Sequence, residues 1–268
     1  MTLPDSMTSP MSILLEVCIA SVDDAVIAAG AGADRLELNA ALELGGLTPS
    51  LGTLIAVKEA VDLPVLVMLR PRPGGFCYST ADVDVMQRDL DLALEHGADG
   101  VVFGLLTEDG RVDAERCARL LARCGDRPAV FHRAFDVTPD PAEALETLID
   151  LGFARVLTSG QEASAYNGAA CIRRLIEQAA GRIEILPGGG INAFTVADVV
   201  ARTGCTQVHA SLRTSRRDPS TAARPHIRFS SPVRAGEDRV GLTDAEAVSD
   251  LRRRLDQAAP ARTALDDR

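Results

Sequence analysis

Short apolar or β-branched runs alternate with amphipathic stretches along the whole chain. Runs of this length and composition predict buried strands, and the stretches between them have the 3.6-residue period of helices. The predicted strands are residues 13–21, 35–40, 64–71, 100–106, 129–136, 155–160, 183–187 and 207–212. The predicted helices are residues 22–31, 51–61, 80–96, 114–123, 141–151, 169–180, 193–203 and 244–257.

Eight successive strand–helix units predict an α/β fold, a single (β/α)8 TIM barrel. The alternative is a doubly wound open sheet, which has no natural count of eight. We expect the barrel domain to span residues 12–258, with disordered tails at 1–11 and 259–268. Residues 213–239 are rich in Arg, Ser and Pro and form a long connection after the eighth strand. Because it follows a strand, we expect this irregular connection to lie over the active face of the barrel.

Charge and composition exclude several classes of protein. The formal net charge is −10, so a nucleic-acid partner is not expected. The first 12 residues lack the basic and apolar regions of a signal peptide, and no apolar run is long enough to span a membrane. The expected location is therefore cytoplasmic, and the six cysteines should stay reduced. Lys58 is the only lysine and falls within a predicted outer helix, which excludes imine-forming catalysis at a strand end.

Catalysis in this architecture takes place at the carboxyl ends of the strands, so the inward residues there are the candidates. The two-residue period of strands puts Glu16 and Cys18 inside on the first strand, and Glu37 and Asn39 inside on the second. The same argument, applied to the strands that follow, gives Arg70, Arg72, His132, Asp136, Ser159, His209 and Ser211.

These residue types suit proton transfer on an anionic substrate. Glu16 and Glu37 would repel each other if both were ionised, so one should have a raised pKa and act as a general acid or base, with His132 as a further proton carrier. Arg70 would bind a carboxylate or phosphate. The alternative is that these four residues form a buried salt-bridge network that closes the barrel.

The remaining candidates would bind the substrate. The glycine turn of Gly188, Gly189 and Gly190 precedes a helix start expected near Asn192 and could present backbone N–H groups to an anion. The predicted substrate-binding set is Arg70, Arg72, Asp136, Ser159, Gly188, Gly189, Gly190, His209 and Ser211. Arg133 falls on the helix-facing side of its strand unless the strand bulges, and both placements remain open.

Several strings of residues resemble one family. They are Glu16-Val17-Cys18, Gly32 to Leu38 (GADRLEL), Gly45 to Ser50 (GGLTPS), Arg70-Pro71-Arg72, Phe131 to Asp136 (FHRAFD), Arg155 to Gly160 (RVLTSG) and Pro187 to Ile191 (PGGGI). In this order, from about residue 13 to residue 216, the chain resembles the CutC family of copper-homeostasis proteins.

The resemblance implies a cytoplasmic (β/α)8 barrel, usually a homo-oligomer (dimer or tetramer), that handles copper. In animal members a copper(I) site is attributed to two cysteines, of which one matches Cys18 and the other stands at the position of Asn39. Gly75 stands near the place of an acidic residue that many members carry. Cys18 is therefore the expected metal ligand, with Cys77 or His209 as candidate co-ligands.

Three functions remain open. The first is copper homeostasis with copper(I) bound at Cys18, no organic cofactor and a copper ion as the partner. The second is a TIM-barrel enzyme, an isomerase, epimerase or lyase, that acts on a small anionic metabolite through Glu16, His132 and Glu37. The third is an oligomeric scaffold whose site no longer works.

Overall fold

A computed structural model describes residues 12–227, 229 and 238–258 of the 268-residue chain. The two predicted tails, 1–11 and 259–268, lie outside the described residues. Eight strands form one parallel sheet: β1 (Leu14–Ile19), β2 (Arg35–Leu38), β3 (Val65–Met68), β4 (Gly100–Phe103), β5 (Ala129–Phe131), β6 (Arg155–Thr158), β7 (Glu184–Pro187) and β8 (Gln207–Ala210).

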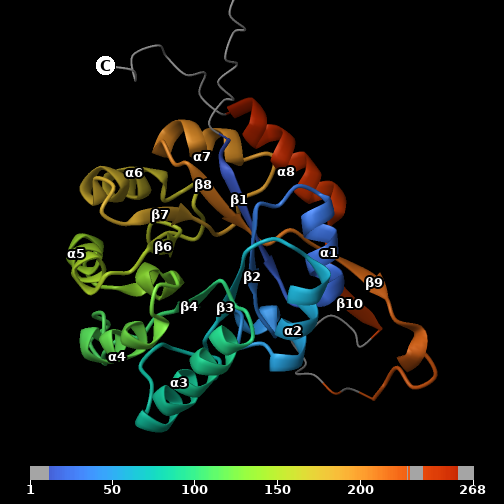
Figure 1. The fold of residues 1–268 in the computed structure, drawn as a ribbon. Coiled ribbons are helices and arrows are strands. Elements are labelled where there is room, and N and C mark those ends of the chain that lie inside the picture. The colour runs from blue at the N-terminus through green and yellow to red at the C-terminus, as the bar shows by residue number, and fades with distance from the viewer. Residues whose placement is uncertain (1–11, 228, 230–237, 259–268) are drawn as a thin grey trace, which may run out of the picture.

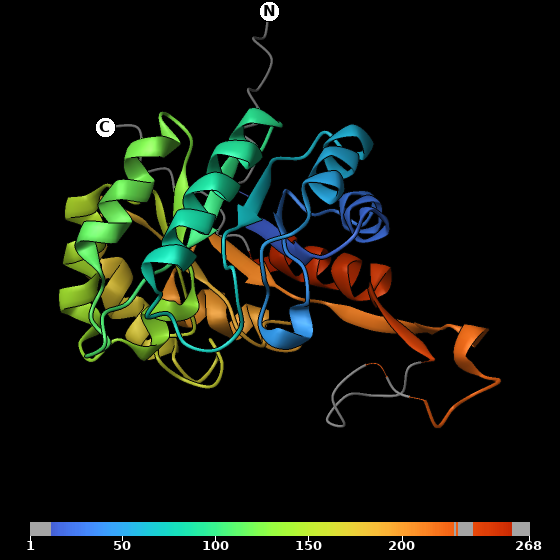
Figure 2. The same ribbon diagram turned by 90° about the horizontal axis from the view of Figure 1, so that it is seen from below.

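The sheet curls into a barrel that is nearly closed. Its strand order is β7-β6-β5-β4-β3-β2-β1-β8, and β7 meets β8 through a parallel bridge between Gly188 and His209. Figures 1 and 2 show the strands at the centre and the helices around them. The predicted TIM barrel is confirmed, and each of the eight predicted strands is present with shorter bounds.

Eight α-helices form the outer ring: α1 (Val22–Gly30), α2 (Leu51–Ala60), α3 (Thr80–Glu95), α4 (Ala114–Cys124), α5 (Pro141–Leu151), α6 (Ala169–Ala179), α7 (Val196–Thr203) and α8 (Ala245–Ala258). Polar caps set several of their starts. The Ser50 hydroxyl accepts from the Thr53 N–H, and Asp140 caps α5 ahead of Pro141. Lys58 lies on α2, in the outer ring, and pairs with Asp99 at 2.5 Å.

Helix α7 begins later than expected. The predicted start near Asn192 is a turn instead, in which the Asn192 Oδ1 accepts from the Phe194 N–H at 2.9 Å. The Thr195 carbonyl then accepts the first helical hydrogen bond, from the Val199 N–H. An Asn side chain that bonds the backbone two residues on favours such a turn over helix.

Strand β5 ends at Phe131, well short of the predicted residue 136. Nδ1 of His132 accepts from the Ala134 N–H at 3.2 Å, and residues Arg133–Val137 follow as a short 3-10 helix, η2. This side-chain bond turns the chain out of the sheet. The strand parity that put Arg133 among the outer helices therefore does not apply, and Arg133 reaches the barrel mouth.

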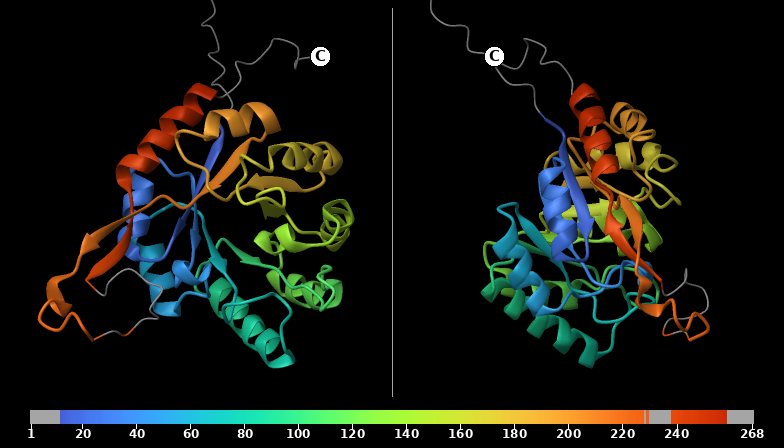
Figure 3. Two further views of the ribbon diagram at one scale, coloured as in Figure 1. Left: turned by 180° about the vertical axis from the view of Figure 1, so that it is seen from behind. Right: turned by 90° about the vertical axis from the view of Figure 1, so that its right-hand side faces the viewer.

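The connection after β8 differs from the expectation of an irregular cover over the active face. Residues Arg213–Arg217 (β9) and Arg239–Thr243 (β10) pair as an antiparallel ribbon that projects past α1, away from the barrel (Figures 2 and 3). A short 3-10 helix, η3 (Pro219–Thr221), follows β9. Asp24 anchors the ribbon, because its carboxylate accepts from Arg213 Nη1 at 2.8 Å and from the Thr243 N–H at 2.6 Å.

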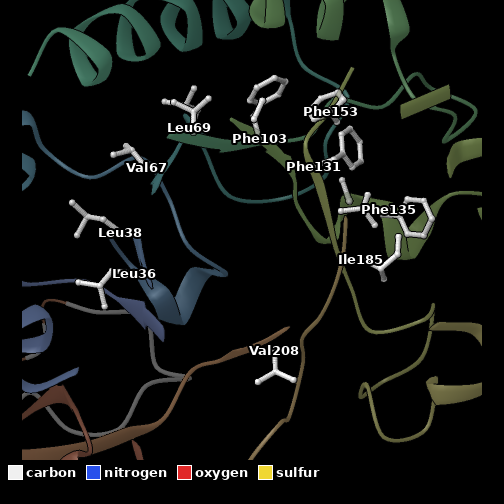
Figure 4. Close-up of a cluster of buried hydrophobic side chains, with 14 of the residues drawn as sticks. Leu36, Leu38, Val67, Leu69, Phe103, Phe131, Phe135, Phe153, Ile185 and Val208 are labelled. Carbon is white, nitrogen blue, oxygen red and sulfur yellow. The ribbon is translucent and has the colours of Figure 1, made fainter. Parts of the chain in front are cut away.

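Two apolar clusters fill the molecule. The larger one lies between strands and helices and takes every second strand residue, including Leu36, Leu38, Val67 and Phe103 (Figure 4). The smaller one lies on the opposite face of the strands, in the barrel interior, and consists of Leu66, Met68, Val102, Val130, Leu157 and Leu186. It comes from β3 to β7 alone, so the part of the interior beside β1, β2 and β8 is left to polar residues. Among the described residues, no helix has the length and apolar character needed to cross a membrane.

Candidate functional site

A cavity of about 200 Å³ opens at the carboxyl ends of the strands. Its apolar lining includes Met68, Phe76 and Leu157. Its polar lining consists of Cys18, Glu37, Asn39, Arg70, His132, Arg133, His209 and Ser211. An apolar pocket with a few convergent polar groups at this face of a barrel is the usual form of a ligand site.

Glu16 lies below this cavity, in a buried ion network. Its carboxylate accepts from Arg35 Nε and from His209 Nδ1, the latter at 2.8 Å. Burial alone would raise the pKa of Glu16, but the hydrogen bonds and charges of His209 and Arg35 outweigh it and lower the pKa to about 2. Glu16 is therefore an anion at neutral pH and acts as the counter-ion of Arg35, with His209 as its second partner. Of the four residues in the salt-bridge alternative drawn from the sequence, this network contains Glu16 alone.

Glu37 behaves in the opposite way. Burial raises its pKa, and the nearby charge of Glu16 raises it further. Asn39 Nδ2 donates to Glu37 Oε2 at 2.7 Å, while Oε1 is buried and has no hydrogen-bond partner among the described residues. Of the two neighbouring glutamates, one has a raised and the other a lowered pKa, so Glu37 is the member of the pair that can carry a proton.

Cys18, Glu37 and His209 form a tight cluster in the cavity wall. One potential ligand atom from each lies within 4.8 Å of the others, and all three residues are buried. Burial and the two glutamates raise the pKa of the Cys18 thiol well above its usual value. Burial opposes protonation of His209, but the charges of Glu37 and Glu16 and the bond to Glu16 outweigh it and raise its pKa.

Asn39 takes the position at which the resemblance places a second cysteine. Its Nδ2 lies 3.3 Å from Cys18 Sγ and 2.7 Å from Glu37 Oε2, so the amide joins the thiol to the carboxyl group. Cys77, the other candidate co-ligand, is exposed and stands outside the cluster. The structure thus brings His209, and not Cys77, next to Cys18.

His132 is buried in the cavity wall as a neutral ring. Burial and the charge of Arg70 lower its pKa to about 3. Because Nδ1 accepts from the Ala134 N–H, the ring proton is on Nε2. Gly104 makes room for the ring, since a Cβ at that residue would stand 2.6 Å from Nδ1.

Arg70 joins two loops at the mouth. Its Nη1 donates to the carbonyls of Leu44 and Gly46, and its Nη2 donates to the carbonyl of Gly74 at 2.7 Å. The guanidinium also lies 5.3 Å from the centre of the Phe76 ring. Arg70 therefore holds the loops after β2 and β3 together as well as lining the cavity.

Arg133 is a lining residue that strand parity alone did not predict. Its Nε donates to Asp136 at 2.7 Å and its Nη2 to Ser159 at 2.8 Å. The guanidinium lies against Gly189, where a Cβ would come within 3.2 Å of Cζ. One local feature of the sequence could have predicted this position. His132 stands at the strand end, two residues before Ala134, and a histidine there can accept from the backbone N–H of Ala134 and so end the strand.

Several predicted site residues lie outside the cavity lining. Arg72 turns away and pairs with Asp82 at 3.1 Å. Asp136 accepts from Thr158 Oγ1 and from the N–H and hydroxyl of Ser159, so it fixes the loops after β5 and β6. Gly188 serves close packing, since a Cβ there would stand 2.5 Å from Leu157 Cδ1. Gly189 and Gly190 have φ of +102° and +72°, which suits a tight turn.

Comparisons with known proteins all indicate the same family. The model of the CutC family matches residues 13–214. A CutC protein of Treponema denticola is 48% identical over 238 residues, which is 89% of this chain and 97% of that protein. The human copper homeostasis protein cutC homolog is 47% identical over 238 residues, or 89% of this chain and 87% of that protein.

Solved structures agree with this result. The crystal structure of CutC from Streptococcus agalactiae superposes with a TM-score of 0.71 at 35% identity, covering 74% of this chain and 97% of that one. Phosphoribosylanthranilate isomerase from Pyrococcus furiosus, at 15% identity and a TM-score of 0.53 over 91% of this chain and 99% of that one, shares the fold alone. The family match and the two close relatives cover most of the barrel, and the chain belongs to the CutC family.

Proposed function

We propose that this protein binds one copper(I) ion at the carboxyl end of the barrel and serves copper homeostasis. The observation that carries the proposal is the cluster of Cys18, Glu37 and His209, whose potential ligand atoms lie within 4.8 Å of one another in a buried wall. A thiolate is the ligand that copper(I) prefers, and an imidazole is an accepted second ligand. The cluster contains both.

Binding would exchange protons for the metal. The raised pKa of Cys18 keeps the thiol protonated at neutral pH, so it would release a proton on coordination. The raised pKa of His209 favours the protonated ring, and any such proton would also be released. One monovalent copper ion would then replace at least the thiol proton, and the positive charge beside Arg35 and Arg70 would not increase. Nδ1 of His209 is held by Glu16, which leaves Nε2 for the metal.

Cys18 provides the single soft ligand of this cluster, and it is the group that suits copper(I). The amide of Asn39 is a hard donor and points an N–H group toward Cys18 Sγ at 3.3 Å. Glu37 is also a hard ligand, and its role would be to balance charge beside the metal. We therefore expect weaker binding than a pair of thiolates would give.

The cellular role rests on the relatives. Both the human and the mouse homologues are named copper homeostasis proteins, at 47% identity to this chain. By this relation we propose a cytoplasmic role, with a homo-oligomer as the working form. Size-exclusion chromatography with light scattering will measure the oligomer in solution.

Anaerobic titration of reduced protein with copper(I), in competition with a chromophoric chelator, tests the proposal. The expected result is one copper(I) per chain with X-ray absorption showing one sulfur at about 2.2–2.3 Å, a value scaled from zinc–thiolate distances. Cys18→Ser should abolish stoichiometric binding, and His209→Gln should weaken it.

Cys77→Ser is the matched control, because Cys77 is an exposed cysteine outside the cluster. It should bind copper(I) like the unchanged protein. Stoichiometric binding that survives Cys18→Ser, or the absence of binding by the unchanged protein, would contradict the proposal.

A further inference from the structure

Arg70 is a buried cation without an acidic partner. Its residue is 6% exposed, and within residues 12–227, 229 and 238–258 no carboxylate lies within ion-pair distance of its guanidinium. Burying an unpaired charge is costly, and folded proteins normally pair such groups. The carbonyls of Leu44, Gly46 and Gly74 satisfy hydrogen bonds but do not neutralise the charge.

Three other arginines of the barrel and its loops differ from Arg70 in this respect. Arg35 pairs with Glu16, Arg72 with Asp82 and Arg133 with Asp136. The fold therefore supplies a carboxylate to arginines inside the barrel and in its loops, but not to Arg70. The missing partner of Arg70 therefore points to an anion that comes from outside the chain.

His132 adds a hydrogen-bond donor to the same cavity. Its ring is neutral with the proton on Nε2, and Nε2 is buried without a hydrogen-bond partner among the described residues. A buried donor that lacks a partner destabilises the fold, so such groups normally mark a bound ligand or water. Arg70 and His132 both line the cavity.

The remaining lining sets the size of the ligand. Met68, Phe76 and Leu157 give the cavity apolar surfaces, and its volume of about 200 Å³ is that of roughly seven water molecules at ~30 Å³ each. A ligand of about six to eight non-hydrogen atoms with one charged oxyanion group would fill it.

We propose that Arg70 and His132 form a binding site for a small organic oxyanion, with Arg70 supplying the countercharge and His132 Nε2 a hydrogen bond. The site uses residues outside the Cys18–Glu37–His209 cluster, although both sets of residues line the same cavity, and it is therefore tested on the metal-free chain. A carboxylate and a phosphate group share the required chemistry, and the experiment separates them. A ligand held here would lie in the same cavity as Glu37, the glutamate that can carry a proton.

Thermal unfolding of the metal-free full chain, at constant ionic strength set with sodium chloride, tests the site. The probes are sodium acetate, sodium malonate, sodium lactate and inorganic phosphate. We expect a saturable rise in Tm of about 2–4 °C at several times Kd for the anion class that binds. A response to the organic acids alone identifies a carboxylate site, and a response to phosphate alone identifies a phosphate site.

Variants decide which residues are responsible. His132→Phe should weaken the response at least tenfold, because it removes the N–H and keeps a planar ring. Arg70→Met should abolish it, and Arg70→Lys should retain part of it through the charge. Arg72→Met is the matched control, since Arg72 lies on the same loop and outside the cavity lining, and it should respond like the unchanged protein.

The result also separates this site from the copper site. Cys18→Ser should lose copper(I) and still show an anion response, and this response should again be lost when His132→Phe is added. If Arg70→Met fails to fold, His132→Phe still decides the question. The proposal is overturned if no probe raises Tm beyond sodium chloride, or if the response persists unchanged in His132→Phe.

Discussion

Nδ1 of His209 donates to Oε1 of Glu16 at 2.8 Å, across the pair of strands β8 and β1. Arg35, on β2, binds the other carboxylate oxygen, so three adjacent strands are joined inside the barrel. This network fixes the ring of His209 with one nitrogen committed to Glu16. The same residue belongs to the cluster with Cys18 and Glu37, so Glu16 helps to hold that cluster in place.

Glu16→Gln should destabilise the protein by about 3–5 kcal/mol, because it leaves the buried Arg35 cation without its anion and removes the carboxylate that accepts from His209. It should also lower the pKa of His209, which Glu16 helps to raise. Urea unfolding measures the first effect, and NMR titration of the imidazole measures the second. Glu146→Gln is the control: it removes an exposed partner of Arg182 and should change stability little. Equal losses in both variants would contradict the buried network.

Asn39→Cys should tighten copper(I) binding at least tenfold. The amide nitrogen of Asn39 lies 3.3 Å from Cys18 Sγ, so a cysteine at this residue would bring a second thiol beside the first. Competition against a chelator of known affinity gives the measurement. Asn39→Ser, which adds no sulfur, is the control. If the two variants bind copper(I) equally well, the site is not built around Cys18.

The His132 ring should stay neutral between pH 5 and 8. Its pKa is lowered to about 3 by burial and by Arg70, whereas in the unfolded chain a histidine titrates near 6.5. Below pH ~6.5 the unfolded state therefore takes up a proton that the folded state does not, and stability falls by up to about 1.4 kcal/mol per pH unit. Long-range ¹H–¹⁵N spectra should show a single Nε2–H tautomer throughout this range.

His132→Asn should remove this contribution to the fall in stability below pH 6.5, because an amide does not titrate. Comparing urea midpoints of the two proteins at pH 7 and pH 5 isolates the effect. A His132 ring that titrates with a pKa above 5 would show that the ring is not buried as described.

Asp24→Asn should loosen the ribbon of β9 and β10. The Asp24 carboxylate accepts from the Ala20 N–H, from Arg213 and from the Thr243 N–H, and bonds to a charged group of this kind contribute about 1.5–3 kcal/mol. We expect faster tryptic cleavage after Arg216 and Arg217 in the variant. Asp23→Asn, at the neighbouring residue, is the control, and equal cleavage rates in both variants would contradict this anchor.

The Asp24 carboxylate also makes a contribution to the free energy of unfolding that depends on pH. Burial would raise the pKa of Asp24, but the bond to Arg213 and the bonds to the backbone outweigh it and lower the pKa. Its contribution is thus complete above the unfolded pKa near 4 and is lost as the pH falls through the folded value. Asp24→Asn should flatten the decline of stability below pH 4.

The strand pattern was sufficient for the barrel and for most of its lining. A period of two put Cys18, Glu37, Arg70, His132 and His209 inside, and these five residues do line the cavity. It failed at Arg72 and Asp136, which lie four and five residues beyond the ends of β3 and β5, whereas Arg70 and His132 lie only two residues and one residue beyond them. It also failed for the connection after β8, because the pairing of β9 with β10 joins segments more than twenty residues apart.

The sequence by itself determined the repeat of eight strands and helices, since hydrophobic period and helix caps are local properties. It also determined which residue types face inward. Only the tertiary structure decided which of the inward titratable side chains are charged. Glu16 and Glu37 are the same residue type on adjacent strands, yet one lies between Arg35 and His209 and the other lies beside a thiol and an amide. A pKa depends on burial and on the charges within a few ångströms, and these arise only when distant strands meet.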